Sequence, residues 1–129
     1  TSGGKGLHVV VPLARRHDWN SFREFAEAIA RLLALRTPED YVASARKSLR
    51  AGRIFVDYLR NTRGATSVAS YSARARPGAP VATPLRWEEL GKLRAPDQFS
   101  VRTLPRRLAG LRDDPWQGFE QLQQRLPKL

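Results

Sequence analysis

The hydrophobic pattern of the first half of the chain predicts two strands and two helices. A continuous apolar run at His8–Leu13 is typical of a strand that is buried on both faces. Apolar residues then recur at helical spacing in Ser21–Arg36, and the first turn of this segment has the Ser-x-x-Glu form of a capping box. A second helix is predicted from the Thr37 cap to the Gly52 stop signal. A second strand is predicted at Arg53–Tyr58.

The second half of the chain is less regular, and it predicts shorter elements. Pro77–Pro84 reads as a turn followed by a short extended piece, and Trp87–Leu90 as one or two helical turns. Phe99–Val101 has the composition of a short strand. Two further helices are predicted, one from Thr103 to Leu111 with a proline in its first turn, and one that starts at Asp114.

Charge narrows the choice of partners. The chain has 129 residues, with 23 lysines and arginines against 12 acidic residues, a net charge of +11 and a pI near 11.3. This balance favours an anionic partner, with nucleic acid or nucleotides first and a membrane surface second. The absence of cysteine excludes disulfides and thiolate metal sites. No apolar run approaches the ~20 residues of a membrane span and no signal peptide is visible, so we expect a soluble intracellular protein.

A glycine-rich stretch, Ser2-Gly3-Gly4-Lys5-Gly6-Leu7-His8, precedes the first apolar run. Glycines let backbone N–H groups approach an anion closely, while Ser2 adds a hydroxyl donor and Lys5 a positive charge. The ring of His8 is placed to donate to a phosphate at the start of the strand. The spacing is not that of a Walker A loop, which a helix follows. The alternative is a flexible end of the chain without a ligand.

Asp57 follows the second apolar run, where a carboxylate loses hydration and needs a cation, a donor or a proton. Arg60 and Arg63 supply fixed positive charge close by in the sequence. This arrangement suits a metal bound together with a polyphosphate, although a structural Asp–Arg pair closing the strand is an equal alternative. Arg74 and Arg76 share a face if they lie on a strand, where they would either clamp phosphates or blunt a solvated edge.

Two stretches together, TSGGKGLHVVVPL and FVDYLRNTRGATSVASYSARARPGAPVATPLRWEEL, resemble the polymerase domain of bacterial ATP-dependent DNA ligase D. That domain belongs to the archaeo-eukaryotic primase superfamily. The resemblance covers about the first ninety residues continuously, with His8 and Asp57 standing 49 positions apart. It implies an α/β (α+β) fold of primase-polymerase type with a mixed, mostly antiparallel sheet and flanking helices. Residues 1–129 would form the C-terminal portion of that single domain.

The same resemblance implies a metal-dependent nucleotidyltransferase that adds nucleotides, preferably ribonucleotides, to DNA ends in non-homologous end joining. The implied cofactor is Mn²⁺ or Mg²⁺, and the implied partners are nucleoside triphosphates such as ATP, DNA ends, a Ku-type end-binding protein and a ligase domain in the same polypeptide. The implied location is the bacterial cytoplasm, at the nucleoid. Asp57 would be the catalytic metal ligand. The implied nucleotide or phosphate contacts are Ser2, Lys5, His8, Arg74 and Arg76, with Arg60 and Arg63 as lesser candidates.

The chain departs from the family pattern because it contains no Asp-x-Asp motif. Nucleotidyl transfer with two metal ions needs several carboxylates, and Asp57 alone cannot hold both ions. We therefore expect the Asp-x-Asp motif to lie upstream in a longer protein, and these 129 residues alone not to polymerise nucleotides. Two readings from other classes stay open: a non-catalytic basic module that binds nucleic acid, and an acid–arginine pair that serves only the fold.

Overall fold

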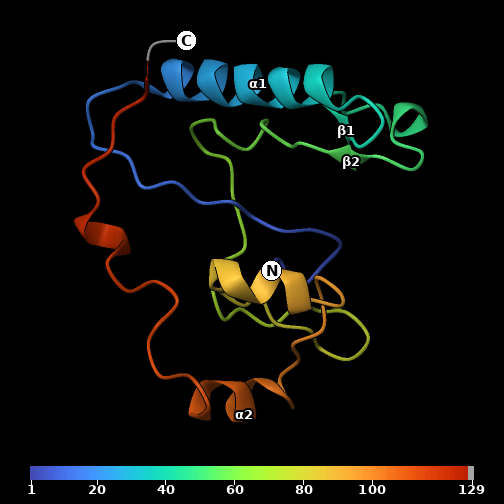
Figure 1. The fold of residues 1–129 in the computed structure, drawn as a ribbon, viewed down its shortest axis with the longest axis vertical. Coiled ribbons are helices and arrows are strands. Elements are labelled where there is room, and N and C mark those ends of the chain that lie inside the picture. The colour runs from blue at the N-terminus through green and yellow to red at the C-terminus, as the bar shows by residue number, and fades with distance from the viewer. Residues whose placement is uncertain (128–129) are drawn as a thin grey trace. The chain divides into compact units, whose positions relative to one another are not determined.

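The computed structural model describes residues 1–127, which divide into two compact units (Figure 1). The glycine-loop unit consists of residues 1–12 and 68–122. The helix unit consists of residues 13–67 together with residues 123–127. The fold mixes helices with short strands, and much of each unit is turns and irregular backbone.

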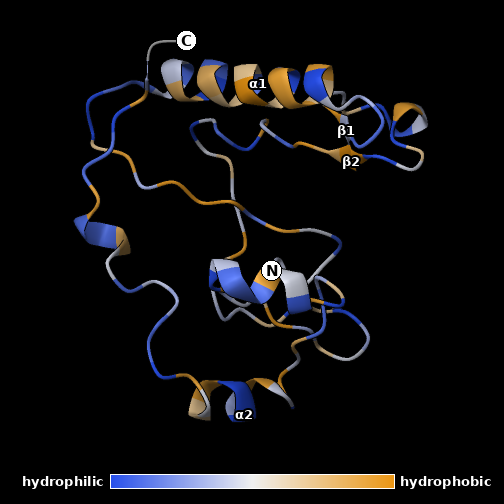
Figure 2. Ribbon diagram, in the orientation of Figure 1, coloured by the Kyte–Doolittle hydropathy of each residue, from blue (hydrophilic) through white to orange (hydrophobic). Residues whose placement is uncertain are grey.

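The helix unit is built on α1, an 18-residue helix at Trp19–Arg36. Its N-cap is Asp18, whose side chain accepts a hydrogen bond of 2.8 Å from the Ser21 backbone N–H. The helix therefore begins two residues before Ser21, and the predicted capping box is wrong. The predicted end at Arg36 is confirmed. Hydrophobic and hydrophilic residues mix along α1, as an amphipathic helix requires (Figure 2).

Next to α1 lies a small parallel sheet in which β1, Tyr41–Val42, pairs with β2, Ile54–Phe55. Ala30 of α1 and Val42 of β1 are buried and form the core of this unit. The helix predicted after Thr37 is wrong, because the chain makes a turn, enters β1 and then forms η1, a 3-10 turn at Lys47–Leu49. Cross-strand bonds replace the helical ones, including a 3.0 Å bond from Val56 N–H to the Val42 carbonyl.

The sheet is smaller than the sequence predicts, and its direction differs. The strand expected at Arg53–Tyr58 is reduced to the two residues of β2. The sheet that the structure describes is parallel, so the expectation of a mostly antiparallel sheet is wrong. Antiparallel pairing among the described residues is limited to isolated bridges, Ala73 with Val81 and Pro80 with Ser100. Of the strand predicted at Phe99–Val101, only the bridge between Ser100 and Pro80 is present.

The core of the glycine-loop unit is the segment Pro80–Pro84, which is buried throughout. Val81 and Thr83 are its most buried side chains, at 2% and 1% exposure. The backbone of Thr83 pairs with Thr1, and that of Ala82 accepts from Tyr71. The buried segment thus holds the start of the chain and the hairpin at residues 71–82 together.

The apolar run after the glycines does not form the strand predicted at His8–Leu13. Val9, Val10 and Val11 are 72%, 52% and 56% exposed, and the segment shows as a hydrophobic stretch without secondary structure (Figure 2). A strand of this kind is buried only when neighbouring strands pair with it and helices cover it. The described part of the chain provides no such partner strand.

Three short helical elements complete the glycine-loop unit. They are η2 at Trp87–Lys92, α2 at Leu104–Ala109 and η3 at Phe119–Gln121. The first two confirm predicted elements, while the helix expected from Asp114 is reduced to turns followed by η3. None of the described helices has both the length and the apolar character that crossing a membrane would need.

A partly buried ion pair ties α2 to η2. Arg107 donates two hydrogen bonds to Glu89, of 2.5 and 3.0 Å, and a third to the Pro84 carbonyl. The bonds from Arg107 are the main cause that lowers the pKa of the Glu89 carboxyl below its ordinary value. The Arg107 guanidinium also lies 4.7 Å from the centre of the Phe99 ring. This cluster fixes the segment that carries the buried core.

Candidate functional site

The glycine-rich loop at Ser2–Gly6 is closed by one buried side chain. Ser2 is 8% exposed, and its Oγ donates to the Gly6 carbonyl at 2.7 Å. The same oxygen accepts from the N–H groups of Gly4 and Gly6, at 3.2 and 3.4 Å. A backbone bond of 3.0 Å from Ser2 N–H to the Gly6 carbonyl adds a fourth link. The loop is therefore held by its own hydrogen bonds, and the alternative of a flexible chain end is wrong.

Gly3 is required because the loop presses against the buried core. Its φ is +61°, a conformation that side chains rarely adopt. A Cβ atom at this position would meet the Ala82 nitrogen and the Val81 carbonyl carbon at 2.9 Å. The loop and the core segment are thus in direct backbone contact, which fixes the loop in place.

Arg74 and Arg76, which the sequence singles out as a pair, both lie against this loop. Arg74 Nη1 donates to the Ser2 carbonyl at 3.1 Å, and the side chain is only partly exposed. The Arg76 guanidinium lies beside Gly4, where its Nη1 would be 3.2 Å from an added Cβ. Arg76 is exposed, and its side chain makes no hydrogen bond or ion pair with the described residues. The structure therefore brings together Ser2, Gly4, Arg74 and Arg76.

Lys5 lies within the loop, and His8 follows Gly6 by two residues. Both are exposed, and neither side chain has a hydrogen-bond or ion-pair partner among residues 1–127. Lys5, His8 and Arg76 are thus three side chains, in or near the loop in sequence or contact, whose donors are free to bind an anion. Ser2 differs, because its hydroxyl is already engaged within the loop.

Asp57 lies in the other unit, and its surroundings differ from those predicted. It is exposed rather than desolvated, and its Oδ1 accepts a local bond of 3.0 Å from the Leu59 N–H. Neither Arg60 nor Arg63 forms an ion pair with it. Arg60 donates instead to the Thr66 carbonyl at 2.8 Å, and Arg63 is exposed. The alternative of a structural Asp–Arg pair is therefore wrong.

Asp57 fits the role of a single metal ligand and no more. Its Oδ2 accepts no hydrogen bond from the described residues, and the residue is exposed. Residues 1–127 contain no cluster of three or more acids or histidines close enough together to hold a metal ion. Divalent cations of the Mg²⁺ type need several oxygen ligands in a defined geometry. These residues do not make a complete metal centre by themselves.

Sequence reasoning missed the importance of Val81 and Ala82, whose backbones the loop contacts. The sequence indicates only a short extended piece between prolines at this point. The available signal was a short apolar run in a segment otherwise rich in turn residues. Such a run predicts burial, but it does not say which glycine will press against it.

Comparison with known proteins identifies the family of this chain. The family described as "LigD, primase-polymerase domain" matches residues 1–116 of the 129. The chain belongs to this family. The resemblance seen in the two sequence stretches is therefore confirmed, and it extends beyond the first ninety residues into the C-terminal part.

Curated relatives of the LigD family are far longer than this chain. The multifunctional non-homologous end joining protein LigD of Pseudomonas aeruginosa is 50% identical over 127 residues, which are 98% of this chain and 15% of that protein. The protein of the same description from Mycolicibacterium smegmatis is 40% identical over 90 residues, 70% of this chain and 12% of that protein. The chain thus spans a small part of each relative.

A solved structure of the LigD family has a similar fold. It is the polymerase domain of Mycobacterium tuberculosis Ligase D in complex with DNA, with a TM-score of 0.71 and 32% sequence identity. The similarity covers 81% of this chain and 36% of that one. The mixed α/β arrangement found here is therefore that of part of a LigD polymerase domain.

Proposed function

We propose that the Ser2–Gly6 loop and the side chains around it hold the triphosphate of an incoming nucleotide. In this proposal the chain is part of a primase-polymerase domain that adds nucleotides to DNA ends during non-homologous end joining. One observation carries the assignment: Arg74 holds the loop backbone while Arg76 lies beside Gly4 without a partner of its own. An ordered loop with unpaired cations beside it is suited to an anion.

The residues divide into two groups by the bonds they already make. Ser2 and Arg74 use their polar atoms to shape the loop, so we assign them the role of positioning residues. Arg76, Lys5 and His8 have free donors, so we assign them the contacts to phosphate oxygens. An arginine beside a polyphosphate can donate two parallel hydrogen bonds, while a lysine acts as a point charge.

The helix unit has a lesser part in the proposal. Asp57 would give one carboxylate oxygen to Mn²⁺ or Mg²⁺, the cofactor that the family resemblance implies. The remaining ligands are not among the described residues, so we expect no steady primer extension by this chain alone. Arg60 and Arg63 stay secondary candidates for phosphate contact.

The test is ATP binding measured by calorimetry at low salt. Arg76→Ala should weaken binding by about tenfold or more, because a charge-assisted pair of hydrogen bonds is lost. Arg94→Ala is the matched control, since it removes the same charge from an exposed site outside the loop. Equal weakening in both variants would show a diffuse electrostatic effect and would overturn the loop as the site.

A second candidate function is supported by the surplus of positive charge. Among the described residues, ion pairs engage Arg31, Arg86 and Arg107, out of 23 basic residues in the chain. A non-catalytic module that binds the DNA backbone would use this surplus without needing the loop. Its signature is an affinity for duplex DNA that falls steeply with salt and is unchanged in Arg76→Ala.

A further inference from the structure

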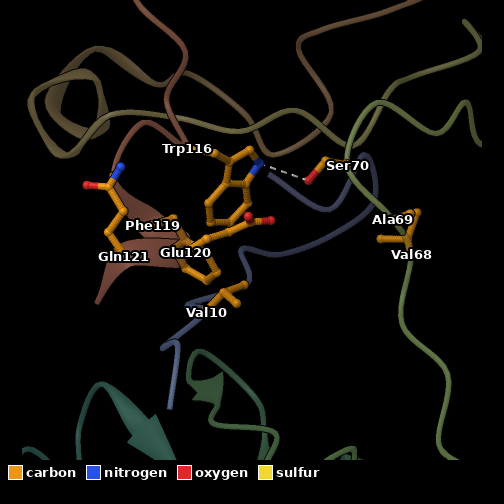
Figure 3. A pocket seen from close by; sticks show the side chains of 9 residues that line it. Val10, Val68, Ala69, Ser70, Trp116, Phe119, Glu120 and Gln121 are labelled. Atoms are coloured by element: carbon orange, nitrogen blue, oxygen red, sulfur yellow. Dashed lines mark hydrogen bonds between the residues drawn. The ribbon is translucent and has the colours of Figure 1, made fainter. Parts of the chain in front are cut away.

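Two aromatic side chains line an open pocket that the proposed phosphate site does not use. The rings of Trp116 and Phe119 pack edge to face, with centres 4.6 Å apart and an angle of 72° between them. The pocket beside them has a volume of about 580 Å³ (Figure 3). Val10, Val68 and Ala69 add apolar surface to it, and Ser70, Glu120 and Gln121 add polar groups.

Hydrogen bonds from neighbouring residues hold the aromatic pair in place. The Trp116 indole N–H donates to Ser70 Oγ at 3.2 Å, and its backbone N–H donates to Asp114 Oδ1 at 2.9 Å. The chain then turns through Gly118, whose φ is +78°, and the Phe119 N–H donates to the Trp116 carbonyl at 2.9 Å. The rings therefore need no rearrangement to receive a ligand, which reduces the entropic cost of binding.

The polar groups of the pocket suit the edge of a nucleobase better than a phosphate. Glu120 is an acceptor that repels phosphate and can take a hydrogen bond from an exocyclic amino group. Ser70 still has a hydroxyl proton to donate after accepting from Trp116, and Gln121 can donate and accept. Flat aromatic and apolar walls suit the face of a base, because stacking on such side chains is the common way to bind unpaired bases.

The pocket is joined to the proposed phosphate site by two chain segments. Val10 follows His8 by two residues, a span of at most about 7 Å along the chain. Ser70 precedes Arg74 by four residues on the other segment. A DNA strand whose phosphates are attracted to the cations around the loop would bring its bases within reach of the pocket.

We propose that this pocket takes an unpaired nucleobase of a single-stranded DNA end, and that it favours bases with an exocyclic amino group over thymine. This proposal rests on the proposed function, because that function is what brings a DNA strand to the chain. It adds a base-binding site formed by Trp116, Phe119 and Glu120, separate from the loop that holds the triphosphate. Stacking provides the affinity, and the Glu120 carboxylate provides the preference.

The experiment uses Trp116 as its own reporter. Trp19→Phe and Trp87→Phe together leave it as the remaining tryptophan, and both replaced side chains are more than half exposed. A deoxycytidylate dodecamer should quench Trp116 fluorescence and bind about tenfold more tightly than an abasic strand of the same length and charge. Equal quenching and equal affinity for the two strands would overturn the proposal. Calorimetry on the unsubstituted chain with the same strands gives the same comparison without any variant.

The preference for an amino group has its own test. A deoxythymidylate dodecamer should bind about three- to tenfold more weakly than the deoxycytidylate one, because one hydrogen bond is lost. Glu120→Ala should remove this difference in affinity but leave the quenching unchanged. The control is Gln117→Ala, a nearby change that leaves the lining side chains intact and should preserve the difference. A difference that survives in Glu120→Ala would contradict the role of the carboxylate.

The two proposals fail separately. Arg76→Ala should weaken ATP binding by about tenfold or more but keep the ratio of affinities between the deoxycytidylate and abasic strands. If the chain binds no ATP and still distinguishes these strands, the loop assignment is wrong and the pocket stands. If ATP binds as proposed and the strands are not distinguished, the pocket assignment is wrong and the loop stands.

Discussion

The glycine loop and the Asp57 turn carry the two motifs that the sequence singles out, yet they are stabilised in different ways. The first three residues of the loop are buried, and the loop is held by four internal hydrogen bonds, by Arg74 and by contact with the core. The Asp57 turn is exposed and has one local bond. The loop residues therefore stabilise the fold as well as forming the proposed phosphate site, whereas Asp57 makes little contribution to the fold beside its proposed role.

The largest effect on stability is expected from Gly3→Ala, which disrupts the contact between the loop and the buried core segment. The substitution forces a left-handed conformation on alanine and places its Cβ 2.9 Å from backbone atoms, so we expect a loss of about 2–4 kcal/mol in the free energy of unfolding. Urea denaturation followed by circular dichroism measures it. Gly6→Ala is the matched control, because open space surrounds that position. Similar losses in both variants would refute the contact.

A smaller effect on stability is expected from Glu89→Gln. This change weakens the ion pair with Arg107, which holds the core segment that the loop contacts. Losing the charged acceptor of two Arg107 hydrogen bonds should cost about 1–2 kcal/mol of unfolding free energy near neutral pH. The folded-state pKa of Glu89 lies below its ordinary value of 4.5. Its contribution is therefore present above pH 4.5 and is lost as pH falls through the folded pKa. The difference between the parent chain and the variant should shrink with acid, and a constant difference would contradict this origin.

The smallest effect on stability is expected from Asp57→Asn. Asparagine keeps the side-chain oxygen that accepts from the Leu59 N–H, so the free energy of unfolding should change by less than about 0.5 kcal/mol. Mn²⁺ should bind the variant more weakly than the parent chain, because the charged ligand is gone. Paired calorimetric titrations of Mn²⁺ into the parent chain and into the variant measure this. A clear loss of stability would show that Asp57 serves the fold after all.

The sequence predicts α1 and the family well but the sheet poorly, and the reason is physical. Helix periodicity and the end at Arg36 are local signals, so α1 is found with an error only at its first turn. Strands depend on partners distant in sequence, and the runs at His8–Leu13 and Arg53–Tyr58 therefore overstate what is paired here.

The sequence predicted which residues make up the candidate site better than it predicted what each residue does there. Glycine composition singled out the loop, the family resemblance assigned it and the two arginines to one phosphate site, and the structure brings Ser2, Arg74 and Arg76 together. The division between residues that shape the loop and residues that are free to bind follows from hydrogen bonds, which a single sequence does not contain. The exposure of Asp57 was missed because an apolar run before an acid suggests burial that depends on tertiary packing.

The exposed valines at positions 9–11 have a practical consequence for colloidal behaviour. A short β-prone apolar segment with unpaired backbone groups is a site where copies of a chain associate. The net charge of +11 keeps molecules apart at low ionic strength, but the screening length falls to about 10 Å at 0.1 M salt. Raising salt to weaken phosphate binding will therefore also remove the repulsion between molecules, and light scattering belongs beside every such titration.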